Sequence, residues 1–435
     1  MPPWRMMSTG RSKVMRKAYG PARVRARGML ARTSHHGASA MALRDLEQAK
    51  QTAERTIEAA SSALREVSLS IHAKPELNYE EHHAHAVLTD YLAAQGFAVE
   101  RGAYGMPTAF KAVTGSGGPT LAVFCEYDAL PGIGHACGHN LIAISGLATG
   151  IALKAALGEG NGTVLVLGSP AEEGGGGKIR MMERGALEGV DAAMMLHPSP
   201  GDTAWPAMIA LEQVNVEYFG RNAHAGAAPW AGVNALDAIV LAYTSISAMR
   251  QQLRPTDRVH GVITKGGEKA NIIPDYTSAQ FLIRSKSLSD LNEVRAKVLG
   301  CFEGAALATG CRLNVVPPPG PAYADVSTND VIAEAYCENM ERFEMRMPSK
   351  EASAGLGGAS TDMGNVSYVV PSIHPVFGIP TEDGAGNHTP GFTAAAATEE
   401  AHRATLRASK ALAMTALDLY ANPDLLKKAW AEMRR

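Results

Sequence analysis

Residues 120–167 read TLAVFCEYDALPGIGHACGHNLIAISGLATGIALKAALGEGNGTVLVL. Both ends of this stretch, Thr120–Cys125 and Thr163–Leu167, are short apolar runs bounded by turn residues, as is typical of buried strands. Between them, Leu141–Leu157 places apolar residues at helical spacing, and a further apolar run, Ala192–Leu196, follows. Strand, helix and strand in this order indicate a parallel sheet with crossover helices. We therefore predict an α/β fold in which helices cover both faces of a mixed, largely parallel sheet.

The pattern changes from about residue 211. Strands are expected at 212–219, 259–265, 277–284 and 312–316, and helices at 234–253 and 288–309. This order, β-α-β-β-α-β, is typical of a ferredoxin-like α+β domain. We expect it to occupy residues 211–317 as an insertion, closed by the proline-rich run at 317–321, within a catalytic domain made of residues 42–210 and 318–435. Upstream, residues 42–95 predict two helices around Pro75.

Charge and cysteine usage limit the class of protein. Residues 1–44 hold ten basic and no acidic side chains, whereas the rest of the chain holds 43 acidic residues against 31 basic ones. The excess of acidic residues after residue 44 argues against a nucleic-acid partner. No uncharged apolar run is long enough to span a membrane, so we expect no membrane partner. Five cysteines, an odd number, favour a reducing compartment. We expect a cytoplasmic protein, or a mitochondrial one if the extension at residues 1–41 is a transit peptide rather than an upstream extension before Met41.

Ionisable side chains follow each of the three apolar runs. Cys137 and His139 come after the first, Glu172 and Glu173 after the second, and His197 after the third. Each alone has an ordinary interpretation as a buried or solvated residue, but the carboxyl ends of adjacent parallel strands meet at one edge of a sheet. Sulfur, imidazole and carboxylate donors together suit Zn²⁺ or another borderline divalent ion.

Two adjacent glutamates suit two roles. Glu173 can coordinate a metal, while Glu172 takes a proton from water that the metal activates and passes it to the leaving amine. This pattern favours metal-assisted amide hydrolysis. The glycine run before Lys178 lacks the residues of a phosphate loop, and no Gly-x-Ser-x-Gly motif occurs. A hydrolase with Cys137 as nucleophile stays open as an alternative.

Five segments carry a family resemblance: EYDALPGIGHACGHN (126–140), PAEEGGGGK (170–178), LHP (196–198), NAHAGAAPWAGVNALDA (222–238) and NHTPGF (387–392). In order and spacing they resemble metallopeptidase family 20, the di-metal aminohydrolases that include aminoacylases, glutamate carboxypeptidases and auxin-conjugate amidohydrolases. The Cys137 and His139 pair resembles the branch that contains auxin-conjugate and aminobenzoyl-glutamate hydrolases. Within that branch, the EYD segment and Asn140 are most similar to the β-alanyl-lysine dipeptidase group of peptidase-family-20 domain-containing proteins. Many relatives have Asp where Asn140 stands.

The resemblance implies two divalent ions, Zn²⁺ or Mn²⁺ with Co²⁺ as a further candidate, held by Cys137, His139, Glu173, His197 and His388. It implies that Glu172 is the general base and that Asp128 orients a ligand. From the inserted domain, His224 would hydrogen-bond the oxyanion, usually in the partner subunit. Asn271 and Arg284 would bind the substrate, with Arg284 gripping a carboxylate.

The resemblance also implies that the inserted domain is a lid and dimerisation domain, so we expect a homodimer. The expected reaction is metal-dependent hydrolysis of the amide bond in a small N-acyl amino acid or dipeptide, with β-alanyl dipeptides favoured. One alternative is an aminobenzoyl-glutamate or auxin-conjugate type amidohydrolase with an aromatic acyl group. An alternative of another class is a non-catalytic metal-binding or scaffold protein.

Overall fold

The computed structural model describes residues 43–317, 320–353 and 358–433. The interpretations that concern residues 1–41, and Pro318 and Pro319 of the expected linker, lie outside these residues.

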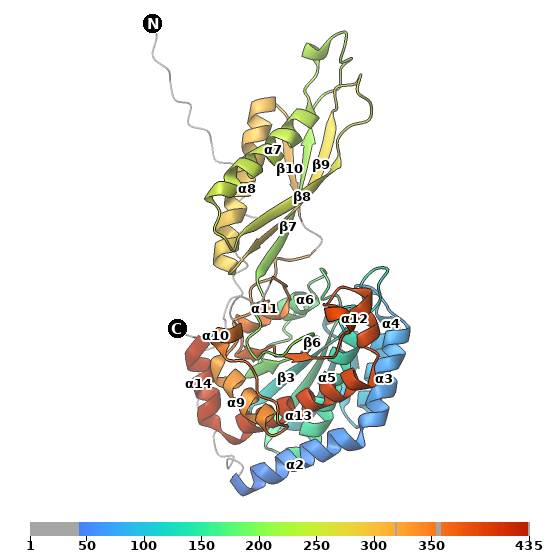
Figure 1. Cartoon of the computed structure of the whole chain (residues 1–435), viewed down its shortest axis with the longest axis vertical. Coiled ribbons are helices and arrows are strands. Elements are labelled where there is room, and N and C mark those ends of the chain that lie inside the picture. The colour runs from blue at the N-terminus through green and yellow to red at the C-terminus, as the bar shows by residue number, and fades with distance from the viewer. Residues whose placement is uncertain (1–42, 318–319, 354–357, 434–435) are drawn as a thin grey trace. The chain divides into compact units, whose positions relative to one another are not determined.

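A six-stranded mixed sheet, in the order β1-β2-β4-β3-β5-β11, forms the centre of the larger part of the structure (Figure 1). β3 runs parallel to β4 and β5, and β11 runs parallel to β5, whereas β1 and β2 are antiparallel to their neighbours. The α/β prediction with a largely parallel sheet is confirmed, while the hairpin of β1 and β2 was not predicted. The strands are β1 (Ala98–Arg101), β2 (Phe110–Ser116), β3 (Thr120–Glu126), β4 (Gly162–Ser169), β5 (Ala192–Met194) and β11 (Ser372–Ile373).

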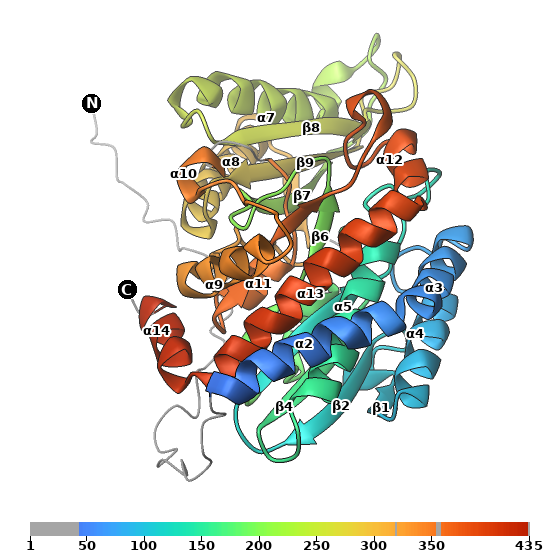
Figure 2. The same cartoon turned by 60° about the horizontal axis from the view of Figure 1, so that its bottom comes forward.

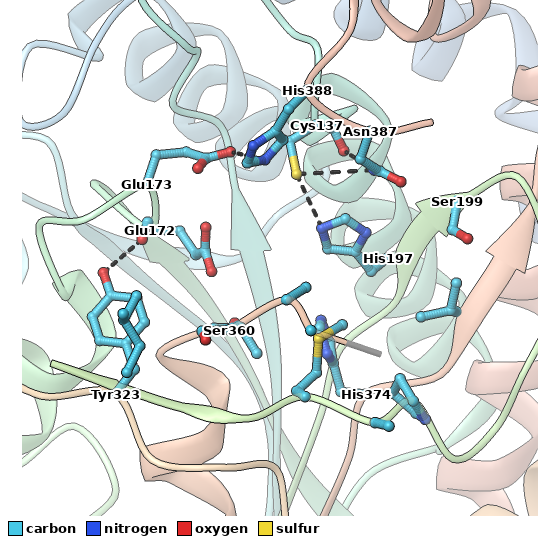
Figure 3. Close-up of a pocket in the computed structure, with 18 of the residues that line it drawn as sticks. Cys137, Glu172, Glu173, His197, Ser199, Tyr323, Ser360, His374, Asn387 and His388 are labelled. Atoms are coloured by element: carbon cyan, nitrogen blue, oxygen red, sulfur yellow. Dashed lines mark hydrogen bonds and ion pairs between the residues drawn. The ribbon is translucent and has the colours of Figure 1, made fainter. Parts of the chain in front are cut away.

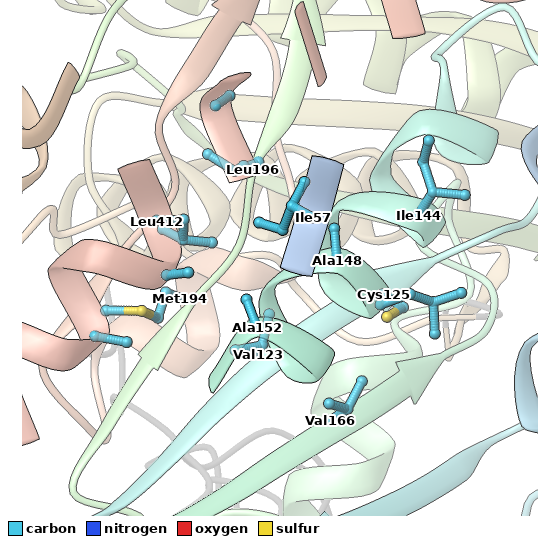
Figure 4. Close-up of a cluster of buried hydrophobic side chains, with 14 of the residues drawn as sticks. Ile57, Val123, Cys125, Ile144, Ala148, Ala152, Val166, Met194, Leu196 and Leu412 are labelled. Carbon is cyan, nitrogen blue, oxygen red and sulfur yellow. The ribbon is translucent and has the colours of Figure 1, made fainter. Parts of the chain in front are cut away.

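Helices cover both faces of this sheet. On one face α2 (Leu43–Ala59), α5 (His139–Ala156) and α13 (Glu399–Ala421) lie side by side (Figure 2). Their apolar side chains pack with Val123 and Cys125 of β3 (Figure 4). The alternate β3 residues, Ala122 and Phe124, pack on the other face with α6 (Gly177–Glu183) and α11 (Met363–Ser367). Because β3 is buried on both faces, its sequence is a continuous apolar run.

The helices before the sheet differ from the prediction in number. Three helices are present: α2, α3 (Ser61–Ala73) and α4 (His82–Ala94). Only the break at Pro75 was predicted, and the second break, at Ala60, precedes two consecutive serines. Serine pairs are a known cause of helix kinks, and here the Ser61 hydroxyl forms a 3.1 Å hydrogen bond with His402.

A second, four-stranded antiparallel sheet has the order β10-β7-β9-β8, with α7 and α8 packed against it. This is the ferredoxin-like arrangement expected from the sequence. The side chains of Asn234 and Ser287 cap the first turns of α7 and α8, and Gly310, with a left-handed φ of 73°, ends α8. The elements are β7 (Ala210–Phe219), α7 (Ala235–Met249), β8 (Arg258–Lys265), β9 (Tyr276–Ser285), α8 (Leu288–Thr309) and β10 (Arg312–Val316).

Shorter elements complete the described chain. β6 (His197–Ser199) and β12 (Val376–Gly378) form a parallel pair beside the main sheet. No helix in the described residues is long and apolar enough to cross a membrane, and all five cysteines are free thiols. The remaining α-helices are α9 (Asp330–Glu341), α10 (Lys350–Ser353), α12 (Pro390–Ala395) and α14 (Pro423–Met433).

Candidate active site

The predicted ligands lie close together, and Figure 3 shows four of them, Cys137, Glu173, His197 and His388. Cys137 precedes α5, and His139 is the first residue of that helix. Gly138 between them has a left-handed φ of 78°, and a Cβ atom there would lie 2.5 Å from Pro198, so only glycine fits this turn. His197 opens β6, and Glu172 and Glu173 follow the end of β4.

Two groups of possible metal ligands share one sulfur atom. Cys137, His139 and His197 form the first group, and Cys137, Glu173 and His388 form the second; within each group the donor atoms lie within 4.8 Å of one another. Cys137 Sγ is 3.4 Å from His197 Nε2, and His388 Nε2 is 3.2 Å from Glu173 Oε1. The structure therefore brings together all five residues that the resemblance implied as ligands.

Asp128 fixes the orientation of His139. Its Oδ1 lies 3.1 Å from His139 Nδ1, and its Oδ2 accepts a 2.9 Å hydrogen bond from the backbone N–H of Glu173. Burial alone would raise the pKa of Asp128, but the charge and the hydrogen bond of His139 hold it below the ordinary value. This contact occupies Nδ1 of His139 and leaves its Nε2 atom for other partners.

Two buried donor atoms without hydrogen-bond partners fit a site for a cation. His139 Nε2 and Glu126 Oε2 lie 3.6 Å apart, and neither has a hydrogen-bond partner among the described residues, although both side chains are fully buried. Buried polar atoms of folded proteins are normally satisfied. A divalent ion would satisfy both the imidazole and the carboxylate oxygen, so the donor set fits a metal.

Glu172 is held by its backbone. Its side chain belongs to neither of the two groups that share Cys137, but its carboxylate forms a third group of possible ligands with Glu126 and His139. Its carbonyl accepts a 2.6 Å hydrogen bond from the Tyr323 hydroxyl (Figure 3). The same hydroxyl accepts hydrogen bonds from the N–H groups of Gly174 and Gly176. Burial, together with the charges of Glu126 and Glu173, raises the pKa of Glu172 well above its usual range. A buried carboxyl group with a raised pKa is suited to both accepting and donating a proton.

A buried ion triad lies beside these donors. Lys178 Nζ bonds the carboxylate of Glu126 and, at 2.6 Å, Oδ1 of Asp362, and all three side chains are fully buried. Burial alone would lower the pKa of Lys178, but the carboxylates of Asp362 and Glu126 raise it above the ordinary value. Lys178 is therefore charged, and it holds Glu126 against His139.

The site opens into a cavity of about 790 Å³, which is in the range of small-molecule pockets. The inserted segment contributes Leu211, Gln213, Leu282 and Arg284 to the lining. Arg284 donates to the carbonyl of Gly358 at 3.1 Å and to the hydroxyl of Ser360 at 3.4 Å, both uncharged. Burial lowers the pKa of this guanidinium. The predicted substrate ligand Arg284 thus lies in the pocket.

His224 and Asn271 do not line this pocket. Both are exposed, and they lie beside each other, since the N–H of Ala225 donates to the carbonyl of Asn271 and His224 pairs with Ile272. His224 Nδ1 accepts from the N–H groups of Gly226 and Ala227. Nε2 is therefore the nitrogen of this exposed ring that is left to donate a hydrogen bond.

The structure adds site residues that the sequence had not assigned. Three of them lie near the predicted ligands. Glu126 is the last residue of β3, and the Asn387 side chain donates a 3.1 Å hydrogen bond to the Pro198 carbonyl. The ring centre of His374 lies 5.5 Å from that of His197. Lys178 had been considered only as part of a phosphate loop. No spacing signal marks Asp362, Tyr323 or His374, because the residues they meet lie far away along the chain.

An α/β fold that places a buried carboxylate beside clustered thiol, imidazole and carboxylate donors defines the class of metal-dependent hydrolases. The peptidase dimerisation domain of the M20 family matches residues 211–309. Over 405 residues the chain is 45% identical to the Xaa-Arg dipeptidase of Mus musculus, with 90% of this chain and 93% of that protein covered. It is 30% identical to a subunit of the p-aminobenzoyl-glutamate hydrolase of Escherichia coli (strain K12), with 86% and 93% covered.

Solved structures show the same fold. A putative aminohydrolase from methicillin resistant Staphylococcus aureus superposes with a TM-score of 0.72 at 20% identity, covering 86% of this chain and 100% of that one. A dinuclear metal binding peptidase of the M20 family from Bacillus subtilis has a TM-score of 0.64 at 21% identity, covering 83% and 99%. The chain belongs to the M20 peptidase family and is a hydrolase, so the predicted family is confirmed and the non-catalytic alternative is set aside.

Proposed function

We propose that the protein is a metal-dependent dipeptidase that cleaves the amide bond between a small aminoacyl group, such as β-alanyl, and a basic C-terminal amino acid. The observation that carries this proposal is the position of Glu172 beside two ligand groups that share Cys137. The Xaa-Arg dipeptidases of Mus musculus and Homo sapiens, 45% and 44% identical to this chain, support the choice of a basic residue. The proposed catalytic domain comprises residues 42–210 and 318–435, and the lid and dimerisation domain residues 211–317.

Two divalent ions are proposed, and Cys137 would be available as a ligand in both sets of donors. His139 and His197 complete one set of donors, and Glu173 and His388 complete the other. Zn²⁺ or Mn²⁺ suits this mixture of thiolate, imidazole and carboxylate, with Co²⁺ as a further candidate. When bound, the ions would polarise the amide carbonyl and favour ionisation of water.

The proton transfers fall to Glu172. Its carboxylate takes a proton from the attacking water and delivers it to the nitrogen of the leaving amine. The hydrogen bond from Tyr323 to its carbonyl fixes the backbone, so the carboxylate keeps its place during both transfers. Arg284 holds the carboxylate of the C-terminal residue, since within the described residues its guanidinium donates hydrogen bonds only to uncharged acceptors.

A homodimer would complete the site. β8 is the edge strand of the second sheet, and Val262 and Ile263 on it are 58% and 40% exposed. On α7, Val240 and Leu241 are 47% and 41% exposed. Pairing of this edge and helix with a second copy would cover apolar surface and an open strand edge. Because His224 lies outside its own pocket, we assign its outward N–H to the oxyanion in the partner's site, with Asn271 beside it.

One experiment tests the proposed chemistry. Release of free amino acids from β-alanyl-lysine, β-alanyl-arginine, N-acetyl amino acids and aminobenzoyl-glutamate is measured by mass spectrometry, with and without chelator. We expect chelator-sensitive cleavage of the β-alanyl dipeptides and recovery on adding Zn²⁺ or Mn²⁺. Preferred cleavage of aminobenzoyl-glutamate would favour the alternative that the Escherichia coli relative suggests. Full activity after complete metal removal would instead favour Cys137 as a nucleophile.

The variant Glu172→Gln isolates the base. It preserves the size of the side chain, so metal content stays at the wild-type level while kcat falls by about 10²- to 10⁴-fold. Glu183→Gln is the matched control, because Glu183 is exposed on α6 and does not line the pocket. Unchanged hydrolysis by Glu172→Gln would refute the assignment of the base.

A further inference from the structure

The pocket carries two fixed charges besides those of the glutamate pair. Among the described residues that line it, Asp202 is the one further carboxylate and Arg284 the one guanidinium. Glu172 and Glu173 are committed to proton transfer and metal binding in the proposed function. A ligand in the rest of the cavity therefore meets one negative and one positive group.

Asp202 has an oxygen available for a ligand. Its Oδ1 accepts a 2.8 Å hydrogen bond from the N–H of Gly378, and the described residues offer its carboxylate no ion-pair partner. The loop that carries it is fixed, because Thr203 and Val376 exchange backbone hydrogen bonds of 2.9 and 2.8 Å. A Cβ atom at Gly378 would lie 3.0 Å from Asp202 Oδ2, so a larger residue there would crowd this carboxylate.

Asp202 and Arg284 belong to one continuous wall. The chain from Asp202 lines the pocket through Pro206, Ala207 and Met208 and then enters β7. There Leu211 pairs in register with Arg284 of β9. Asp202 and Arg284 thus line the same cavity, and an amino acid that carries both a cation and a carboxylate would complement their charges.

We propose that Asp202 pairs with the cationic side chain, a guanidinium or ammonium group, of the substrate's C-terminal residue, while Arg284 pairs with the carboxylate of that residue. This inference rests on the proposed function and specifies its substrate class. Charge-assisted hydrogen bonds are stronger than neutral ones and penalise a neutral side chain of the same shape. Asp202 is thus a specificity residue rather than a catalytic one.

A dipeptide also carries a cation at its amino group, so the test separates the two sources with four substrates. β-Alanyl-arginine has both cations, and β-alanyl-citrulline lacks the side-chain charge but keeps its shape. Propionyl-arginine lacks only the amine, and propionyl-citrulline lacks both charges. For the metal-loaded wild-type enzyme we expect kcat/KM to fall about 10- to 100-fold from each arginine substrate to its citrulline counterpart.

The variant Asp202→Asn removes the charge and keeps an oxygen for the N–H of Gly378, so the loop stays anchored. We expect it to lower kcat/KM for both arginine substrates about 10- to 100-fold and to leave both citrulline substrates within about twofold of wild type. Glu382→Gln is the control, since Glu382 is exposed near His388 in the chain and does not line the pocket. It should retain the wild-type preference.

Two results would overturn the proposal. The first is a preference for arginine over citrulline substrates that Asp202→Asn leaves intact. The second is a loss of kcat/KM in Asp202→Asn that occurs with the β-alanyl substrates but not with the propionyl substrates, because Asp202 would then bind the amino group. Calorimetric titration with free arginine and free citrulline separates this inference from the proposed function. If the wild type cleaves none of the four substrates, the dipeptidase proposal fails. In that case the cation site would still be supported if the wild type binds free arginine and Asp202→Asn does not. It would be rejected if the wild type binds free arginine and free citrulline equally.

Discussion

Replacing Lys178 with methionine tests whether the buried triad is ionic. The Lys178 ammonium contacts the Glu126 carboxylate and lies 2.6 Å from Asp362 Oδ1, with no exposure to solvent at any of the three side chains. Methionine keeps an unbranched apolar chain over the ring of Phe124, and the backbone N–H of residue 178 still donates to Asp362 Oδ2. The change therefore removes the charge and little else.

The expected loss follows from the two carboxylates that remain. Breaking a buried ion pair by removing one partner costs about 3–5 kcal/mol in the free energy of unfolding. Burial raises the pKa of Asp362 to about 6 even with the opposing effect of Lys178, and without Lys178 it rises further. A carboxyl group whose folded-state pKa is raised stabilises the fold below its unfolded pKa, and this is lost as pH rises through the folded value. The loss in Lys178→Met should therefore be full at pH 8 and smaller at pH 5.

Urea unfolding of chelator-treated protein, followed by circular dichroism at pH 5 and pH 8, measures this difference. Lys427→Met is the control, because the ion pair of Lys427 with Asp424 is 73% and 78% exposed and such pairs contribute at most about 1 kcal/mol. Adding Asp362→Asn to Lys178→Met should recover part of the loss at pH 8 by removing one buried charge. An equal free energy of unfolding for Lys178→Met and wild type at pH 8 would refute the ionic triad.

Three further predictions concern the site. Glu81, whose Oε1 accepts hydrogen bonds from the N–H groups of Tyr79 and Ala171, lies beside the residue that precedes Glu172. Burial, together with the charge of Asp128, raises the pKa of Glu81 from 4.5 to about 7, so wild-type stability falls as pH rises through 7. Glu81→Gln should therefore be more stable than wild type by about 3 kcal/mol at pH 8.5 but not at pH 4.5, as measured by urea unfolding. His224→Ala should lower kcat about 10²- to 10³-fold. Mixing it with Glu172→Gln should restore about a quarter of wild-type activity if His224 acts across the dimer, and no restoration would reject that role. Arg284→Gln should raise KM about 10- to 100-fold for free-carboxylate substrates but not for C-terminal amides, and an equal effect on both would exclude carboxylate binding.

The parallel strands were predictable because burial on both faces leaves a clear pattern. β3 and β4 are continuous apolar runs, which only a two-sided core explains. β2 alternates buried and partly buried residues and ends in exposed ones, a pattern too short to separate from a loop. The break between α2 and α3 was missed because no proline or glycine marks Ala60.

The positions of the site residues could be predicted where they follow directly from the order of the strands in the sheet. Cys137, Glu172 and His197 follow strands that pair side by side, so their convergence follows from the strand order. Lys178 shows the limit of such reasoning. A lysine after four glycines is typical of an exposed turn, and its burial depends on Asp362, which lies 184 residues further along the chain.

The charge around the proposed metal ligands explains why the carboxylate that recognises the substrate is separate from those that surround the metals. Lys178 is one cation among five buried or nearly buried carboxylates that surround the ligands, Glu126, Asp128, Glu172, Glu173 and Asp362. An excess of negative charge in a buried site destabilises the fold unless cations compensate it. Bound divalent ions would supply that compensation, so these carboxylates are not free to attract a cationic substrate. A carboxylate that recognises the substrate must therefore lie outside the cluster, and Asp202, which accepts a hydrogen bond from Gly378 of β12, is not one of these five.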